Sequence, residues 1–199
     1  MSVIIIAEAG VNHNGSFVLA KKLIEKAALC KASAIKFQIF NADDLATKKA
    51  RMANYQVKNL KKNISQHKML KSLELKKEDY IKLKKIARQN KIDFLVSVFD
   101  EKSLDFFEKH IKSKIIKIPS GEITNYFLLK KINLNKYKVI LSTGMSNLTE
   151  IKDALNVISK KEVFEIKNNN IFIKNKKKYL YIKDRIFLLH CVSDYPTKE

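Results

Sequence analysis

Six residues near the middle of the chain, Lys117 to Glu122, place a cation, a hydroxyl group and a carboxylate directly after an apolar run. Ile115, Ile116 and Ile118 predict a short buried strand that carries Lys117 within it. A buried ammonium group is costly unless it is paired, so this lysine requires an anionic partner. Taken alone, the stretch fits two readings equally well: a site for an anionic ligand, or a structural salt bridge between lysine and glutamate.

Similar polar residues end the other apolar runs of the chain. In residues 34–39, Ile35, Phe37 and Ile39 share one face of a predicted strand, whereas Lys36 and Gln38 share the other. The polar face of such a strand must look toward something that accommodates a charge. The polar residues at or just beyond the predicted strand ends are Glu8, Lys36, Gln38, Ser97, Lys117, Ser120, Glu122, Ser142 and His190.

Two lysines and two serines of this set suit a ligand that carries a phosphate group. Lys36 and Lys117 would supply the positive charge, and the hydroxyl groups of Ser120 and Ser142 would supply hydrogen-bond donors. The alternative is that each lysine pairs with an interior glutamate and serves the fold alone.

The carboxylates and His190 suggest further chemistry at the same strand ends. Glu8 and Glu122 are candidates for binding substrate hydroxyl groups and for proton transfer, or else for salt bridges. His190 follows a strand whose Leu188 lies on the same face, so we expect its imidazole to point into the site, where it could hold a divalent metal. Alternation then points Cys191 to the opposite face. A lone histidine is also often purely structural.

The remaining histidines carry weaker signals. His13 lies in the loop after the first apolar run and could approach the same site, whereas His67 and His110 have polar neighbours in the sequence and are expected to be solvated. The sequence contains no glycine-rich phosphate loop, no metalloprotease motif and no Ser/His/Asp arrangement.

The elements that must position these residues alternate between strand and helix. A long polar connection between Asn41 and Lys71 exceeds ordinary loop length and is expected to be functional. Residues 161–184 form an Asn- and Lys-rich insertion with a possible hairpin at residues 171–173. The expected strands are residues 3–7, 34–39, 93–98, 115–118, 139–141 and 186–189, and the expected helices begin near Ser16, Lys76, Leu104, Asn125 and Asn147.

This alternation predicts a parallel α/β architecture. An open sheet concentrates its site at one switch point, whereas a (β/α)8 TIM barrel draws on every strand end, so the distribution of polar residues favours the barrel. A barrel of this kind needs eight strands and about 250 residues. The chain has 199 residues and shows about six βα units. We therefore expect residues 1–199 to form one incomplete barrel domain, truncated after the sixth unit.

Composition limits the other classes of function. The formal charge of +20 invites a nucleic-acid interpretation, but the lysines are scattered through successive helices, which favours solvated faces and no specific nucleic acid. Two cysteines, Cys30 and Cys191, form no disulfide framework and suggest a reducing compartment. The short apolar run at the start is neither a signal peptide nor a membrane span, so a cytoplasmic location is expected.

Five stretches of the chain resemble the sialic acid synthase family, which includes the N-acetylneuraminate and legionaminic acid synthases. They occur in family order and read IAEAGVNHNG, KFQ, KIPSGEITN, ILSTGM and LLHCVSDYPT, at residues 6–15, 36–38, 117–125, 140–145 and 188–197. NYQ at residues 54–56 and SLEL at residues 72–75 are more similar to the legionaminic acid branch.

The resemblance implies a transferase that condenses phosphoenolpyruvate with an N-acetylmannosamine-like sugar, giving a nine-carbon 2-keto sugar acid and phosphate. A divalent metal, manganese or magnesium, would polarise the sugar aldehyde. The family pattern implies contacts to phosphoenolpyruvate for Lys36, Lys117, Ser120 and Ser142. It also implies sugar-side roles for Glu8 and Gln38, proton transfer by Glu122, and metal binding by His190.

The chain also departs from the family pattern. Ser97, Val98, Phe99 and Asp100 stand where the family usually has Ser-Thr-Pro-Phe, so the expected threonine hydroxyl is missing. The family's second metal histidine follows a seventh strand, and its C-terminal antifreeze-like domain, which contributes to a homodimer, would lie later still. The alternative to an active synthase is therefore a truncated, inactive remnant of one.

Overall fold

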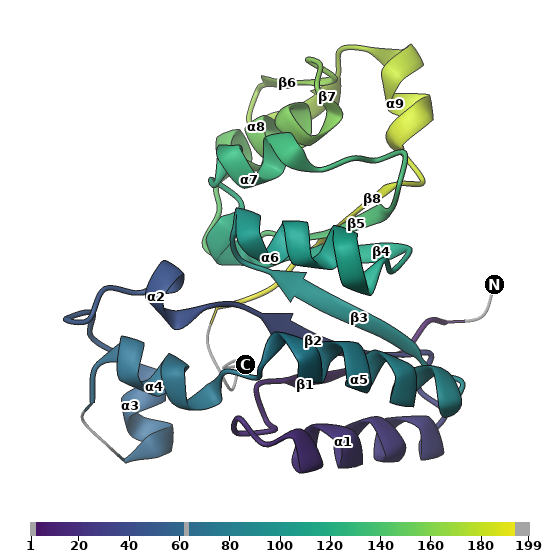
Figure 1. The fold of residues 1–199 in the computed structure, drawn as a ribbon. Helices are drawn as coiled ribbons and strands as arrows, with labels where there is room; N and C mark the ends of the chain where they lie inside the picture. The colour runs from purple at the N-terminus through teal and green to yellow at the C-terminus, as the bar shows by residue number, and fades with distance from the viewer. Residues whose placement is uncertain (1–2, 62–63, 194–199) are drawn as a thin grey trace. The chain divides into compact units, whose positions relative to one another are not determined.

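The computed structural model describes residues 3–61 and 64–193, and the chain divides into two compact units at residues 113 and 114 (Figure 1). Within the first unit, parallel strands β1, β2 and β3 lie in that order, and within the second unit β4, β5 and β8 do the same. Their bounds are Ile6–Gly10, Ala34–Ile39, Asp93–Val98, Ile115–Ile118, Lys138–Ser142 and Ile186–Leu189. The predicted parallel α/β fold is confirmed.

Two amphipathic helices cover one face of the sheet in the first unit. Helices α1 (Phe17–Leu29) and α5 (Lys77–Gln89) lie side by side there, and each buries its apolar stripe (Figure 1). Ser16 caps α1 by accepting a hydrogen bond from the backbone N–H of Leu19. The fully buried Tyr80 of α5 donates a 2.6 Å hydrogen bond to the carbonyl of Gln38, which fixes this helix to the end of β2.

The long connection between β2 and α5 is not an irregular loop. It contains three short helices, α2 (Ala42–Leu45), α3 (Asn54–Leu60) and α4 (Gln66–Leu73). A hydrogen bond and an ion pair join α2 to α4: Asp43 contacts His67 at 2.8 Å and Lys71 at 3.1 Å. His67, expected to be solvated, is instead partly buried: its side chain is 16% exposed and lies beside Asp43.

The first unit ends with α6 (Glu101–Phe106) and the π-helical segment η1 (Phe107–Ile111). The carboxylate of Asp100 caps α6 by accepting hydrogen bonds from the N–H and the hydroxyl group of Ser103. Asp100, one of the residues that departs from the family pattern, is thus a helix cap in this structure.

The second unit combines its strands with helices and a hairpin that packs on α8. Helices α7 (Tyr126–Lys131) and α8 (Leu148–Ser159) pack together, and the predicted capping box of α8 forms between Asn147 and Glu150. The predicted hairpin is also present, as the antiparallel pair β6 (Phe164–Lys167) and β7 (Asn170–Ile173), followed by α9 (Lys176–Ile182). A short 3-10 turn, η2 (Ser120–Glu122), follows β4.

The first strand differs from expectation. The apolar run at residues 3–7 was predicted to be buried on both faces, but Val3, Ile4 and Ile5 are 84, 69 and 59% exposed and the strand begins at Ile6. The described residues pair β1 with β2 on one side only. Apolar character alone therefore placed the strand about three residues too early.

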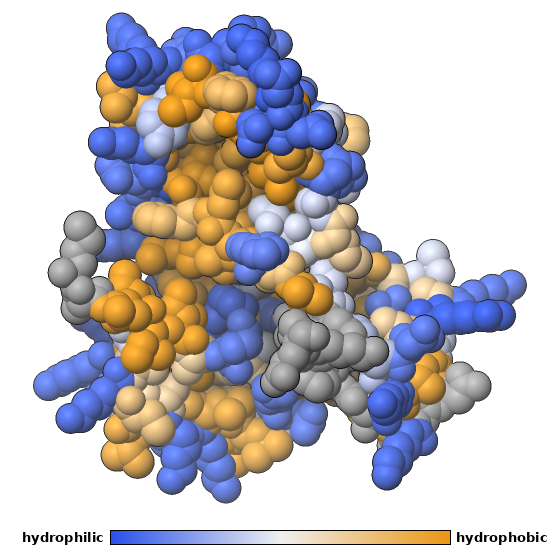
Figure 2. All heavy atoms as spheres, turned by 180° about the vertical axis from the view of Figure 1, so that it is seen from behind, coloured by the Kyte–Doolittle hydropathy of each residue, from blue (hydrophilic) through white to orange (hydrophobic). Residues whose placement is uncertain are grey.

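On the face drawn in Figure 2, hydrophilic side chains lie mainly toward the edges, and broad areas of apolar side chains are exposed between them. Among the described residues, no helix is both long and apolar enough to cross a membrane.

Several helices end at a lysine in the left-handed backbone region, where glycine is the preferred residue. Lys91 follows α5 with φ +55°, and we expect Lys91→Gly to raise the free energy of unfolding by about 1 kcal/mol, because glycine has no Cβ to strain this conformation. Lys85→Gly, inside the same helix, is the matched control and should lower the free energy of unfolding by about 1 kcal/mol. Urea unfolding measures both changes. A stability loss for Lys91→Gly would contradict the argument.

Candidate functional site

In the first unit, Lys36 is the centre of a buried polar cluster. Its side chain is 10% exposed, and its Nζ lies 2.5 Å from Glu8 Oε2 and 3.1 Å from Ser97 Oγ. Parallel pairing places Glu8 directly opposite Lys36, and Ser97 pairs with Gln38 on the other neighbouring strand. Three strands thus bring a carboxylate, an ammonium and a hydroxyl together.

One alternative left open by the sequence is a lysine–glutamate pair, and Lys36 does pair with a glutamate, Glu8 of the neighbouring strand β1. The pair is not closed to solvent, however, since the Glu8 side chain is 52% exposed. Ser97 was placed at a strand end by the sequence but was not assigned to the site. The structure makes it the second partner of Lys36.

A bulge in β1 sets the direction of Glu8. The register shifts between Glu8, which pairs with Lys36, and Gly10, which pairs with Phe37. Gly10 has φ +50°, and a Cβ added to it would lie 3.3 Å from Glu8 Oε1 and 3.7 Å from Gln38 Nε2. Bulges of this kind re-aim side chains at the ends of strands. Glu8 and Gln38, the two candidate sugar-binding residues, therefore both lie against Gly10.

His13 lies beneath this turn and is fully buried, with 0% exposure. Its Nδ1 accepts a 3.1 Å hydrogen bond from the backbone N–H of Gly15, and its ring lies 5.9 Å from that of Phe37. The other nitrogen, Nε2, has no hydrogen-bond partner, which costs roughly 1–3 kcal/mol for a buried polar group. Burial lowers the pKa of His13, although the nearby Gly10 carbonyl opposes this shift. The imidazole is therefore neutral near pH 7.

In the second unit, Ser120 and Gly144 form the centre of the predicted phosphate contacts. The Oγ of Ser120 accepts a 3.0 Å hydrogen bond from the backbone N–H of Gly144. A Cβ on Gly144 would lie 2.6 Å from Ser193 Oγ, 2.9 Å from Ser120 Oγ and 3.1 Å from the carbonyl oxygen of Cys191. The turn that contains Ser120 and the segment that contains Cys191 and Ser193 thus both lie against Gly144. A larger residue at this position would have to displace their atoms.

The carboxylate of Glu122 is held by the residue that caps the following helix. Asn125 Nδ2 donates a 2.8 Å hydrogen bond to Glu122 Oε2, and Asn125 Oδ1 accepts from the N–H of Leu128 in the first turn of α7. One amide side chain therefore joins the helix cap to the candidate proton-transfer group. Lys117 lies within β4, and Glu122 lies in the turn η2 that follows this strand. Both side chains are partly exposed.

The predicted direction of Cys191 is wrong. Its Sγ lies 3.8 Å from Ser120 Oγ and donates to the carbonyl of Leu189 at 3.3 Å, so it joins the residues predicted to bind phosphate. His190 is exposed instead. Strand β8 ends at Leu189, and the period-two alternation used to orient residues 190 and 191 does not continue beyond it.

Burial raises the pKa of the Cys191 thiol, but hydrogen bonds outweigh this effect. Side-chain bonds with Ser142 and Ser120, and backbone bonds with Thr143 and Gly144, stabilise the thiolate, so that the net pKa lies below its ordinary value. The donors that would hold a phosphate oxygen are therefore arranged around a sulfur atom in this structure.

Metal binding by His190 stays a prediction; His190 is exposed just beyond the end of β8. Within residues 3–61 and 64–193, no group of three or more histidine, cysteine, aspartate or glutamate side chains is arranged to hold a metal ion. A complete site would therefore need ligands in addition to those that the described residues bring together.

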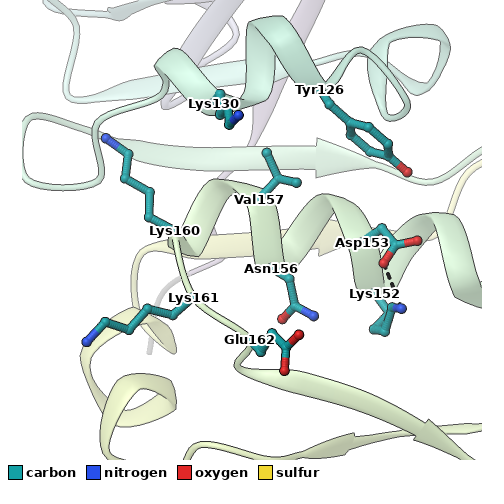
Figure 3. Close-up of a pocket in the computed structure, with 9 residues that line it drawn as sticks. All are labelled: Tyr126, Lys130, Lys152, Asp153, Asn156, Val157, Lys160, Lys161 and Glu162. Atoms are coloured by element: carbon teal, nitrogen blue, oxygen red, sulfur yellow. Dashed lines mark ion pairs between the residues drawn. The ribbon is translucent and has the colours of Figure 1, made fainter.

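An open pocket of about 710 Å³ lies elsewhere in the second unit (Figure 3). Figure 3 shows the side chains of Lys160 and Lys161 extending away from the other lining residues, while Lys152 pairs with Asp153 at 2.6 Å. Its charged groups do not converge on a common point. The lining residues are Tyr126, Lys130, Lys152, Asp153, Asn156, Val157, Lys160, Lys161 and Glu162, and none of them is a predicted site residue.

Comparison with known proteins gives the family. The profile of the NeuB family matches residues 23–199. The N,N'-diacetyllegionaminic acid synthases of Campylobacter jejuni and Legionella pneumophila are 46% and 40% identical to the chain over 98% and 99% of its length, which corresponds to 52% and 51% of theirs. The chain therefore spans about half the length of the curated relatives it matches.

A solved structure supports the same relationship. The N-acetylneuraminic acid synthetase of Leptospira borgpetersenii, crystallised with citrate, superimposes with a TM-score of 0.73 at 33% identity, over 100% of this chain and 57% of that one.

Acid should destabilise the protein through His13. The pKa of His13 is lowered in the folded state, so the unfolded chain binds the extra proton first, and stability is lost as the pH falls below about 6.5. We expect His13→Asn to weaken this loss between pH 7 and pH 5. Urea midpoints at several pH values measure it. His110→Asn, at an exposed histidine, is the control and should behave like the unchanged protein. If the unchanged protein and both variants lose stability identically as the pH falls, His13 is not the cause of the loss.

The thiol of Cys191 should react with iodoacetamide at a lower pH than an ordinary cysteine, because hydrogen bonds stabilise its thiolate. Ser120→Ala removes one donor and should shift the midpoint of the rate–pH profile upward. Mass spectrometry of the peptide that contains Cys191 follows the reaction, and the exposed Cys30 serves as an internal reference for reagent activity. No upward shift in Ser120→Ala would show that Ser120 does not stabilise the thiolate.

Family profile, identity and fold agree with the motifs that run through both units, and the chain belongs to the NeuB family.

Proposed function

We propose that this chain carries the phosphoenolpyruvate and sugar contacts of a synthase that makes a nine-carbon 2-keto sugar acid. The observation that carries the proposal is the cluster of Glu8, Lys36 and Ser97, in which a buried ammonium group within a parallel strand lies beside an exposed carboxylate. The relatives are named as legionaminic and sialic acid synthases, which supports a sugar acid product.

The reaction forms one carbon–carbon bond and breaks one carbon–oxygen bond. The third carbon of phosphoenolpyruvate attacks the aldehyde carbon of an N-acetylmannosamine-like sugar, and the aldehyde oxygen takes up a proton. Water adds to the second carbon of phosphoenolpyruvate, and the bond to the phosphate oxygen then breaks to give the 2-keto group and inorganic phosphate. No oxidant or reductant is required.

The side chains divide into a phosphate group and a sugar group. Lys36, Lys117, Ser120 and Ser142 would bind phosphoenolpyruvate, because ammonium and hydroxyl groups match its charge and oxygens. An incoming phosphate or carboxylate group would compete with Glu8 for the ammonium group of Lys36. The Glu8 carboxylate could then accept a hydrogen bond from a hydroxyl group of the sugar.

Gln38 and Glu122 complete the sugar side. The amide of Gln38 lies near the same turn as Glu8, and Glu122 would transfer the proton at the aldehyde oxygen. Asn125 holds one oxygen of Glu122 and so orients the carboxylate.

A divalent metal remains part of the proposal, with His190 as one ligand. When bound, manganese or magnesium would polarise the aldehyde oxygen. A homodimer and a cytoplasmic location are likewise proposed by analogy with the family.

Phosphate release tests the function directly. The chain is incubated with phosphoenolpyruvate, manganese, and either N-acetylmannosamine or its 2,4-diacetamido-6-deoxy analogue, and released phosphate is measured against samples that lack the sugar. Sugar-dependent release supports the proposal. Failure to release phosphate with either sugar, together with no binding of phosphoenolpyruvate by calorimetry, would favour the inactive alternative.

Lys36→Gln should lower kcat/KM by roughly 100-fold, because it removes a positioned charge from the phosphate site. Lys21→Gln, at an exposed lysine that pairs with Glu25 in the same helix, is the matched control and should retain the unchanged rate. Steady-state kinetics with varied phosphoenolpyruvate measure both variants. Equal rates in the two variants would remove Lys36 from the site.

A further inference from the structure

A buried nitrogen atom without a partner marks the loop between β1 and α1. His13 is 0% exposed, and its Nε2 makes no hydrogen bond of ordinary geometry, although the carbonyl of Gly10 lies near the ring. Buried polar groups are nearly always satisfied, so each exception needs an explanation. A phenylalanine or leucine would fill the same space without a buried donor. The imidazole must therefore supply something that an apolar side chain does not.

The other ring nitrogen provides the explanation. Nδ1 of His13 accepts from the N–H of Gly15, two residues later, at 3.1 Å. Asparagine and aspartate side chains usually close turns of this type. Here the closing group is a ring that is long enough to reach back under the preceding strand and pack against Phe37.

The contact with Phe37 connects the loop to the candidate site. Phe37 is the strand partner of Gly10, the left-handed residue of the β1 bulge, and the carbonyl of Gly10 also interacts with His13. Gly10 in turn lies against the ends of the Glu8 and Gln38 side chains. The loop that His13 closes onto Gly15 therefore starts at Gly10, which lies against the Glu8 carboxylate that pairs with Lys36.

The backbone of the same loop follows one tight turn after another. Asn12 N–H donates to the carbonyl of Ala9, Asn14 N–H to that of Val11, and Ser16 N–H to that of His13, all within 2.8–2.9 Å. Gly15 has φ +71°, and a Cβ there would lie 2.6 Å from the carbonyl oxygen of Ser72. Both ends of the loop are therefore fixed, and the His13 side chain fills the space between them.

We propose that His13 is a positioning residue, which holds the Gly10 turn and thereby places the Glu8 carboxylate beside Lys36. Its role in the reaction rests on the proposed function, through the assignment of Glu8 to the sugar. Its role in placing Glu8 does not depend on that assignment.

Two substitutions separate positioning from simple packing. His13→Asn keeps a turn-closing oxygen for the N–H of Gly15 but loses the ring and leaves a small cavity. His13→Phe keeps the ring against Phe37 but has no acceptor for Gly15. Packing alone predicts that His13→Phe is the better tolerated variant in every measurement. Positioning predicts the opposite order for Glu8 geometry and for sugar use.

The first measurement is structural and needs no activity. Crystal structures of both variants should show Glu8 and Lys36 still paired in His13→Asn, and separated beyond about 4 Å in His13→Phe. The free energy of unfolding, measured in urea, should follow the opposite order, with His13→Phe more stable than His13→Asn. Retention of the pair in His13→Phe would overturn the proposal.

The second measurement uses sugar-dependent phosphate release. His13→Phe should raise KM for the sugar roughly tenfold, with a smaller change in KM for phosphoenolpyruvate, because a misplaced Glu8 affects the sugar. His13→Asn should restore KM to within about twofold of the unchanged enzyme, and His110→Asn should leave both constants unchanged. Loss of sugar affinity in His13→Asn as severe as in His13→Phe would contradict the proposal.

The crystal structures and the kinetic measurements together distinguish failure of the positioning role from failure of the proposed function. If the unchanged chain releases no phosphate, the proposed function fails, and the crystal structures still decide whether His13 places Glu8. If the unchanged chain is active and both variants keep the pair, the proposed function stands and the positioning role is wrong.

Discussion

The ammonium group of Lys36, buried in the central strand of the first unit, is the constraint on which the candidate site depends. Removing such a group from water is expensive unless opposite charge and hydrogen-bonding groups surround it. Glu8 and Ser97 meet this requirement, one from each neighbouring strand. Their positions follow from the strand register. Glu8 of β1 pairs directly with Lys36, whereas on β3 the direct partner of Lys36 is Leu95, and Ser97 lies two residues farther along that strand.

A salt bridge and a ligand site are compatible interpretations of this cluster. The exposed side chain of Glu8 leaves one side of the pair accessible, whereas Lys36 itself has little contact with solvent. An anion that approaches from the Glu8 side would exchange one negative partner of Lys36 for another. Exchange of this kind avoids leaving a buried charge unpaired at any stage, so the same pair can stabilise the empty fold and bind an anionic substrate.

The second unit solves a different problem, the close approach of three chain segments. Gly144 has no side chain, so Ser120, Cys191 and Ser193 can lie around its backbone. The same residues provide hydroxyl, thiol and backbone N–H groups just beyond the ends of β4, β5 and β8. Each unit therefore supplies polar groups at strand ends, and in each a glycine permits the contact: Gly10 beside Glu8, and Gly144 beside Ser120.

The sequence by itself determined the parallel α/β class, the bounds of β2, β3, β4 and β8, and the family, because strand periodicity, capping residues and short motifs are local properties. It also identified Lys36 and Glu8 as candidate site residues, but it placed them at strand ends, whereas the structure places both within their strands. Only the tertiary structure decided that these two pair, that Cys191 rather than His190 lies beside Ser120, and that His67 pairs with Asp43. These contacts join residues far apart in the chain. Their geometry depends on strand register, on the bulge at Gly10 and on where β8 ends, none of which the local pattern of residues specifies.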